Sequence, residues 1–178
     1  NLPTVLDPVM VATSGDALIT PPTVQRLRQQ LFAHCSVITP NLDELGLLAG
    51  RPIQDLNSAL DAAHQLIDQG ARAVLVKGGH LQGARLTDTL IDASGVRWQR
   101  SAPRLISHNL HGTGCSLSSA IAAHLAQGLS LVEAVEAAHI WVRAALLGAL
   151  DLRLGAGHGP LNHFHHPLPL QLLKKKQA

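Results

Sequence analysis

Hydrophobic residues in the first part of the chain follow two alternating spacings. Short runs of valine, isoleucine and leucine indicate buried strands, and apolar residues three or four apart indicate amphipathic helices between them. The runs at residues 5–10, 36–39 and 73–77 predict strands, and helical spacing predicts helices at about residues 21–31, 42–48 and 57–69. This alternation predicts βαβ units around a mostly parallel sheet.

The pattern changes after residue 80. Residues 87–91 and 96–99 flank a glycine-containing turn and predict a hairpin that adds antiparallel strands to the sheet. Residues 112–127 and 131–147 predict two helices that pack together against the sheet. Glycine, histidine and proline dominate from Gly155 onward, so we expect regular structure to end there. The basic tail at residues 167–178 is expected to be mobile.

Composition limits the class of protein. The chain is 46% hydrophobic and 15% charged, which favours one globular, soluble domain. No apolar stretch approaches the roughly 20 residues of a membrane-spanning helix, and the first residues do not resemble a secretory signal. Two cysteines, Cys35 and Cys115, suggest reduced thiols in the cytoplasm. A net charge of +2 with few aromatic residues argues against nucleic-acid binding.

The segment His111-Gly112-Thr113-Gly114-Cys115 comes directly before a predicted long helix. Glycines allow close backbone approach, and the free N–H groups at a helix start favour a phosphate or a developing negative charge. Cys115 in the same first turn could be stabilised as a thiolate and act as a general base. The alternative is a tight turn followed by a small, buried cysteine.

Three further positions offer polar groups at the ends of predicted strands. Asp7 and Lys77 each follow an apolar run, and ligands of open α/β sheets bind at the carboxyl ends of strands. Lys77 could therefore meet a phosphate, although a solvated lysine before a turn is the ordinary interpretation. Asn41 and Glu44 share one helix face and could hold Mg²⁺ through water, or could simply form a capping box.

Histidines at the end of the chain invite a zinc interpretation. His158, His163, His165 and His166 fall within ten residues. No matching set of cysteine or carboxylate ligands accompanies them, so a zinc site is not the favoured interpretation.

Four motifs occur in a characteristic order and spacing. Together they resemble the hydroxymethylpyrimidine and phosphomethylpyrimidine kinases of thiamine biosynthesis, which have the ribokinase-like three-layer α/β/α fold. Cys115 is the most discriminating residue, because related sugar and pyridoxal kinases mostly carry aspartate there. The motifs are Asp7–Ala12, Thr39–Asn41 with Glu44, Val76–His80 and His111–Cys115.

The resemblance implies a role for each matched residue. Cys115 would take the proton from the attacking oxygen, and the amides of Gly112, Thr113 and Gly114 would stabilise the transferring phosphoryl group. Lys77 would contact the phosphates of ATP, with Asp7 in the same electrostatic network. Asn41 and Glu44 would organise hydrated Mg²⁺. Val9 resembles a position in the substrate pocket. The substrates implied are 4-amino-5-hydroxymethyl-2-methylpyrimidine and its monophosphate.

Two departures from the family pattern affect these expectations. Thr13 stands where the family often has lysine. The resemblance covers residues 1–166; ahead of Asp7 the family has further strands and part of the pyrimidine pocket, and we expect their absence to expose an apolar sheet edge. The resemblance implies a homodimer or a complementing N-terminal segment as partner. Two alternatives remain open: a non-catalytic nucleotide-binding or oligomerisation module, and a pyridoxal kinase.

Overall fold

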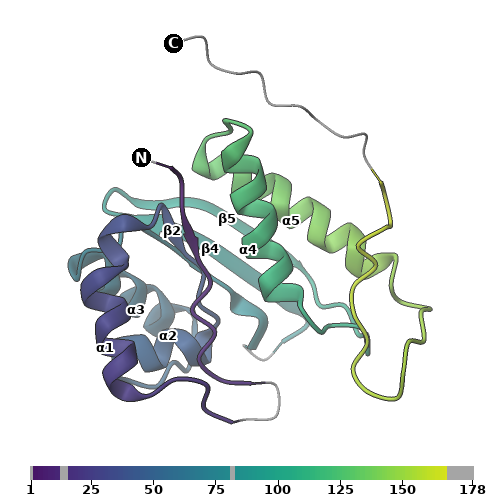
Figure 1. Cartoon of the computed structure of the whole chain (residues 1–178), viewed down its shortest axis with the longest axis horizontal. Helices are drawn as coiled ribbons and strands as arrows, with labels where there is room; N and C mark the ends of the chain where they lie inside the picture. The colour runs from purple at the N-terminus through teal and green to yellow at the C-terminus, as the bar shows by residue number, and fades with distance from the viewer. Residues whose placement is uncertain (1, 13–15, 81–82, 168–178) are drawn as a thin grey trace. The chain divides into compact units, whose positions relative to one another are not determined.

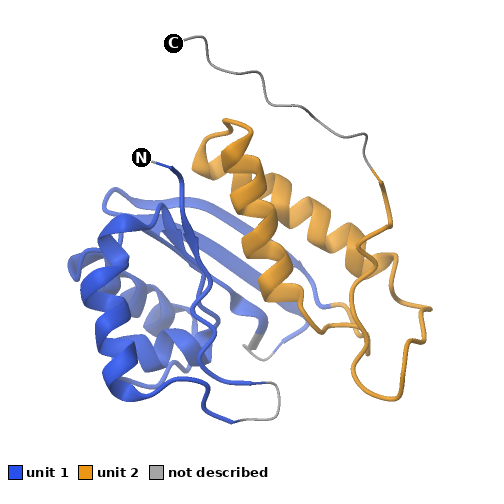
Figure 2. Ribbon diagram, in the orientation of Figure 1, with its two compact units in different colours: residues 1–104 blue, residues 105–178 orange. Residues whose placement is uncertain are grey.

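The computed structural model describes residues 2–12, 16–80 and 83–167 (Figure 1). The chain divides into two compact units, residues 1–104 and residues 105–178 (Figure 2). Thr13 and the basic tail from residue 168 onward lie outside the described residues.

Unit 1 contains a five-stranded sheet in the order β1-β2-β3-β4-β5. Pairing is parallel from β1 through β3 and antiparallel from β3 through β5. The predicted hairpin is present and longer than expected. The strands are β1 (Val5–Leu6), β2 (Val37–Ile38), β3 (Ala73–Val76), β4 (Arg85–Asp92) and β5 (Gly95–Pro103).

Three helices in unit 1 match the predicted ones to within about two residues. They are α1 (Pro21–Gln30), α2 (Leu42–Ala49) and α3 (Leu56–Asp68), with short 3₁₀ turns at Phe32–His34 and Gly78–His80. The apolar faces of α2 and α3 pack on the sheet, as the spacing of their hydrophobic residues predicts. The core includes Phe32, Leu42, Leu45, Leu48, Leu66, Val74, Val76 and Ile91.

The first strand is shorter than the apolar run predicts. Strand β1 ends at Leu6, because Pro8 has no N–H to donate and the Val9 amide turns back to the Asp7 carbonyl at 2.9 Å. The chain then makes an antiparallel bridge between Val11 and Ala17. Asp7 therefore directly follows the strand, as expected.

Unit 2 contains the two predicted helices, α4 (Thr113–Ala126) and α5 (Leu131–Leu147), which pack against each other. Gly128, with φ of 94°, turns the chain between them, and Ser130 caps α5 through a capping box with Glu133. Beyond α5 the described residues form no further helix or strand, which confirms the expected end of regular structure. Packing of these helices on the sheet stays a prediction.

Candidate functional site

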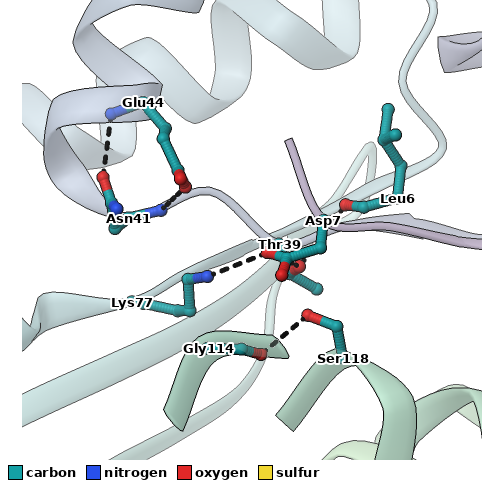
Figure 3. A network of polar contacts seen from close by, with 8 residues as sticks. All are labelled: Leu6, Asp7, Thr39, Asn41, Glu44, Lys77, Gly114 and Ser118. Carbon is teal, nitrogen blue, oxygen red and sulfur yellow. Dashed lines mark hydrogen bonds and ion pairs between the residues drawn. The ribbon is translucent and has the colours of Figure 1, made fainter. Parts of the chain in front are cut away.

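Three polar side chains meet where β1, β2 and β3 end (Figure 3). Nζ of Lys77 lies 3.2 Å from Oδ1 of Asp7, and Oγ1 of Thr39 donates to the same oxygen at 3.3 Å. The carboxyl ends of parallel strands meet at one edge of a sheet, so each strand delivers one group to the same place. The structure thus brings together the predicted pair, Asp7 and Lys77, and adds Thr39.

Burial makes this cluster electrostatically significant. The side chains of Lys77 and Asp7 are only 13% and 16% exposed, and Thr39 is fully buried. Charges in such a setting interact more strongly than they do in water. An ammonium group has three donors, and the hydrogen bond to Asp7 uses one of them. Lys77 is therefore held in place while keeping the capacity to bind an anion.

Asn41 and Glu44 form the capping box of α2. Oδ1 of Asn41 accepts from the Glu44 amide at 2.8 Å, and Oε2 of Glu44 accepts from the Asn41 amide at 2.8 Å. This confirms the capping interpretation. The chain beside it is tied to the Lys77 strand end, because the Lys77 amide donates to the Pro40 carbonyl at 3.2 Å and Asn41 bridges to Lys77.

The same pair also fits a hydrated Mg²⁺ by its chemistry. Mg²⁺ prefers oxygen ligands and usually keeps several waters, so a carboxylate and an amide oxygen are suitable outer partners. Glu44 is 4% exposed, and its Oε2 accepts the backbone N–H of Asn41. The cap and the metal role do not exclude each other.

The turn after Lys77 is fixed by two residues that sequence reasoning missed. The Gly78 amide donates to Oδ1 of Asp88 at 2.8 Å, and Nη1 of Arg104 donates to the Gly79 carbonyl at 3.0 Å. A Cβ atom on Gly78 would overlap the backbone carbonyl of Thr87. A glycine is therefore required here because β4 approaches closely, and this long-range contact has no local signal in the sequence.

In unit 2 the glycine-rich segment forms the start of α4. Gly112, with φ of 82°, is the N-cap, and Thr113, Gly114 and Cys115 make the first turn. The Thr113 amide makes a long hydrogen bond of 3.3 Å to the Leu110 carbonyl. Backbone N–H groups of a first helical turn lack partners within the helix and carry the positive end of its dipole. The turn can therefore receive an anion.

Cys115 is exposed, so the interpretation as a small buried hydrophobe is wrong. Ser118 stabilises this turn through its Oγ, which donates to the Gly114 carbonyl at 3.0 Å (Figure 3). Ser116 follows Cys115 and hydrogen-bonds to His163 at 2.9 Å. Neither Ser116 nor His163 was assigned such a role by sequence reasoning.

The remaining candidates are Val9 and the histidines near the end of the chain. Val9 is 41% exposed and so is accessible to a ligand. Within residues 2–12, 16–80 and 83–167 no group of three or more histidine, cysteine, aspartate or glutamate side chains could hold a metal ion. His165 instead shares a hydrogen bond with the Asn162 carbonyl through its Nδ1 at 3.0 Å.

Sequence comparison identifies the group to which these motifs belong. The profile of the family described as phosphomethylpyrimidine kinase matches residues 1–162. The chain belongs to this family. The hydroxymethylpyrimidine/phosphomethylpyrimidine kinase of Rhizobium meliloti (strain 1021) is 48% identical over 162 residues, which are 90% of this chain and 60% of that protein. The thiamine biosynthesis bifunctional protein ThiED of Geobacter sulfurreducens is 46% identical, covering 89% of this chain and 32% of that protein.

Solved structures confirm the ribokinase-like class for the part of the fold that this phosphomethylpyrimidine kinase family member spans. The pyridoxal kinase from Staphylococcus aureus in complex with AMP-PCP has a TM-score of 0.81 at 30% identity, covering 91% of this chain and 58% of that chain. The phosphomethylpyrimidine kinase from Clostridium difficile 630 has a TM-score of 0.66 at 30% identity, covering 81% and 57%. The chain thus spans about 60% of the length of its kinase relatives.

Within the described part of the chain, no helix is both long and apolar enough to cross a membrane.

Proposed function

We propose that this chain carries the nucleotide-binding and phosphoryl-transfer part of a hydroxymethylpyrimidine/phosphomethylpyrimidine kinase that uses ATP and Mg²⁺. The observation that supports this most strongly is the buried Lys77–Asp7 pair at the strand ends, beside the Asn41–Glu44 box. Family membership over residues 1–162 supports the same assignment.

In this proposal unit 1 holds the charged end of ATP. Lys77 donates to phosphate oxygens, and Asp7, which also accepts from Thr39, keeps its ammonium in place. Glu44 and Asn41 would hold the waters of Mg²⁺, which would supply positive charge at the phosphates. A positioned cation is effective here because phosphoryl transfer depends mainly on orientation and charge stabilisation.

Unit 2 supplies the groups for the transfer itself. The hydroxyl oxygen of the substrate forms a bond to the γ-phosphorus of ATP while the bond to the β,γ-bridging oxygen breaks, and ADP leaves. Cys115, exposed in the first turn of α4, takes the hydroxyl proton as a thiolate. Backbone amides of Gly112, Thr113 and Gly114 stabilise the transferring phosphoryl group.

The proposed substrates are 4-amino-5-hydroxymethyl-2-methylpyrimidine and its monophosphate, with Val9 in the substrate pocket. Cys115 favours a pyrimidine substrate over pyridoxal, and the structural likeness to pyridoxal kinases keeps pyridoxal as the competitor to test. Because the chain spans about 60% of its relatives' length, we propose that the remaining section comes from a longer chain or a complementing segment. A homodimer in the cytoplasm completes the proposal.

The test is ADP formation with Mg·ATP and each of three acceptors: hydroxymethylpyrimidine, its phosphate and pyridoxal. The 178-residue chain is compared with Cys115→Ala, and Cys35→Ala serves as the matched control because that thiol is buried. Turnover of the pyrimidines that is lost only in Cys115→Ala supports the kinase. Preference for pyridoxal overturns the substrate assignment.

A non-catalytic nucleotide-binding module is the second candidate, because the Lys77–Asp7 pair and the Asn41–Glu44 box could hold Mg·ATP without any proton transfer. It predicts Mg·ATP binding that Lys77→Ala weakens, with no ADP formed on any acceptor. Adding a separately produced N-terminal section from a relative would restore turnover if the chain is an incomplete kinase. No restoration would favour the binding module.

A further inference from the structure

The segment that follows α5 in unit 2 makes backbone hydrogen bonds to the loop that precedes α4. The Gly159 amide donates to the His108 carbonyl at 3.1 Å, and the His111 amide donates to the Gly159 carbonyl at 3.2 Å. His111 and Pro160 form a parallel bridge. Residues 108–111 are thereby fixed immediately before Gly112, the N-cap of α4.

A buried asparagine makes this contact tight. Asn109 is 3% exposed, and its Nδ2 donates to the Leu152 carbonyl at 3.0 Å and to the Ala149 carbonyl. A Cβ atom on Gly159 would overlap Oδ1 of Asn109. The side-chain amide of Asn109 makes both of these hydrogen bonds, so a change of its rotamer would break buried hydrogen bonds.

The same segment reaches the first turns of α4 through one side chain. Nε2 of His163 lies 2.9 Å from Oγ of Ser116, the residue after Cys115. The His163 ring packs on Trp141 of α5, with ring centres 5.9 Å apart. The backbone before His163 is fixed by Asn162, whose backbone amide donates to the Ala145 carbonyl at 3.1 Å. His163 is thus held by α5 and directed at Ser116.

We propose that His163 is a positioning residue that acts through Ser116 to hold the start of α4 in the conformation that receives a phosphate group. This rests on the proposed phosphate-binding role of the glycine-rich turn. When Nε2 carries the ring proton, His163 donates to Ser116 and leaves the serine hydroxyl hydrogen for an anion. Amide groups bind an anion well only when the turn that carries them is fixed.

The test is a double-mutant cycle in the full chain with Ser116→Ala and His163→Ala. Each single variant should weaken ATP and ADP binding by about 3- to 10-fold, the range expected when one ordinary hydrogen bond is lost, and the double variant should be no weaker than either. His163→Gln, whose side-chain amide can also donate, should recover most of the affinity. His166→Ala, an exposed histidine three residues on, is the matched control.

A second readout does not depend on nucleotide. Amide hydrogen exchange at residues 112–116 of the unliganded chain should be faster in Ser116→Ala and in His163→Ala, and close to the unmutated rate in His163→Gln. Additive losses of affinity, failure of glutamine to rescue, or unchanged exchange would each overturn the positioning role.

The two readouts also separate this inference from the proposed function. If the unmutated chain binds no ATP and Lys77→Ala changes nothing, the nucleotide-binding proposal fails, and exchange at residues 112–116 still decides whether His163 positions the turn. Faster exchange in the variants would support the positioning. Unchanged exchange would end it.

Discussion

Nζ of Lys77 and Oδ1 of Asp7 lie 3.2 Å apart although the two residues belong to strand ends that are not neighbours in the sheet. Strand β2 lies between β1 and β3, and its following residue, Thr39, donates to the same Asp7 oxygen. One carboxylate therefore links the ends of three strands, so the contact is structural as well as a means of placing a cation.

Lys77→Met should destabilise the chain by about 1–3 kcal/mol, because it leaves the Asp7 carboxylate mostly buried without its cation. Asp7→Asn should cost a similar amount, and the double variant less than the sum. Urea unfolding measures all three. Arg97→Met is the control, since its pair with Asp92 is more exposed than the Lys77–Asp7 pair and should contribute less than about 1 kcal/mol. Equal losses of unfolding free energy in Lys77→Met and Arg97→Met would contradict the view that burial makes the Lys77–Asp7 pair the stronger one.

Gly78→Ala should lower the free energy of unfolding by about 1–3 kcal/mol, because the new Cβ meets the Thr87 backbone carbonyl, which cannot move without disturbing β4. Gly79→Ala is the neighbouring control: a Cβ there meets no atom within 4 Å. Thermal or urea unfolding of both variants distinguishes them. A larger loss at Gly79 than at Gly78 would refute the close approach of the strand.

The two thiols should react with a thiol reagent at very different rates. Burial raises the pKa of the Cys35 thiol, an effect partly offset by the charge of Arg72, whereas Cys115 is exposed. At about pH 8 the folded chain should show one fast thiol and one that reacts only on unfolding. Cys115→Ala should remove the fast phase and Cys35→Ala the slow one. Two fast phases in the native chain would show that Cys35 is accessible.

Acid should weaken α5 through its N-terminal cap. The side-chain hydroxyl of Ser130, and then its backbone amide, lower the pKa of Glu133 below its ordinary value of 4.5. A carboxyl group whose pKa is lower in the folded than in the unfolded chain stabilises the fold at pH values above its unfolded-state pKa. That stabilisation is lost as the pH falls through the folded-state pKa. Unfolding free energy should therefore fall with acid below about pH 4.5.

Ser130→Ala should make that fall shallower, because it removes the hydroxyl that favours the charged form. Ser119→Ala, at an exposed position within α4, is the control and should keep the original pH dependence. Urea unfolding at several pH values from about 6 down to 3 gives the slopes. An identical slope in Ser130→Ala and the unmutated chain would remove Glu133 as the source.

The pattern of hydrophobic and polar residues predicted most helices and strands, and it also predicted that Asp7 and Lys77 lie at strand ends. Helices α2, α3 and α5 follow from apolar spacing and from the residues that cap them. Asp7 and Lys77 were found because parallel strands end at a common edge. Strand β1 was overestimated, since a run of apolar residues does not reveal that the chain turns back at Pro8 and Val9.

The contacts that sequence reasoning missed join residues far apart in the chain. Asp88 reaches Gly78 across 10 positions, and His163 reaches Ser116 across 47. No periodicity encodes such pairs. Asn41 and Glu44 show a different limit, because the same spacing of oxygen groups serves both a helix cap and a hydrated cation.

Arg104 is the last residue of unit 1, and its guanidinium binds the carbonyls of Gly79 and Gly83. The chain leaves for unit 2 from this residue. The start of the connection is therefore anchored to the turn that follows Lys77, so a substitution at Arg104 would release the Gly79 and Gly83 carbonyls together.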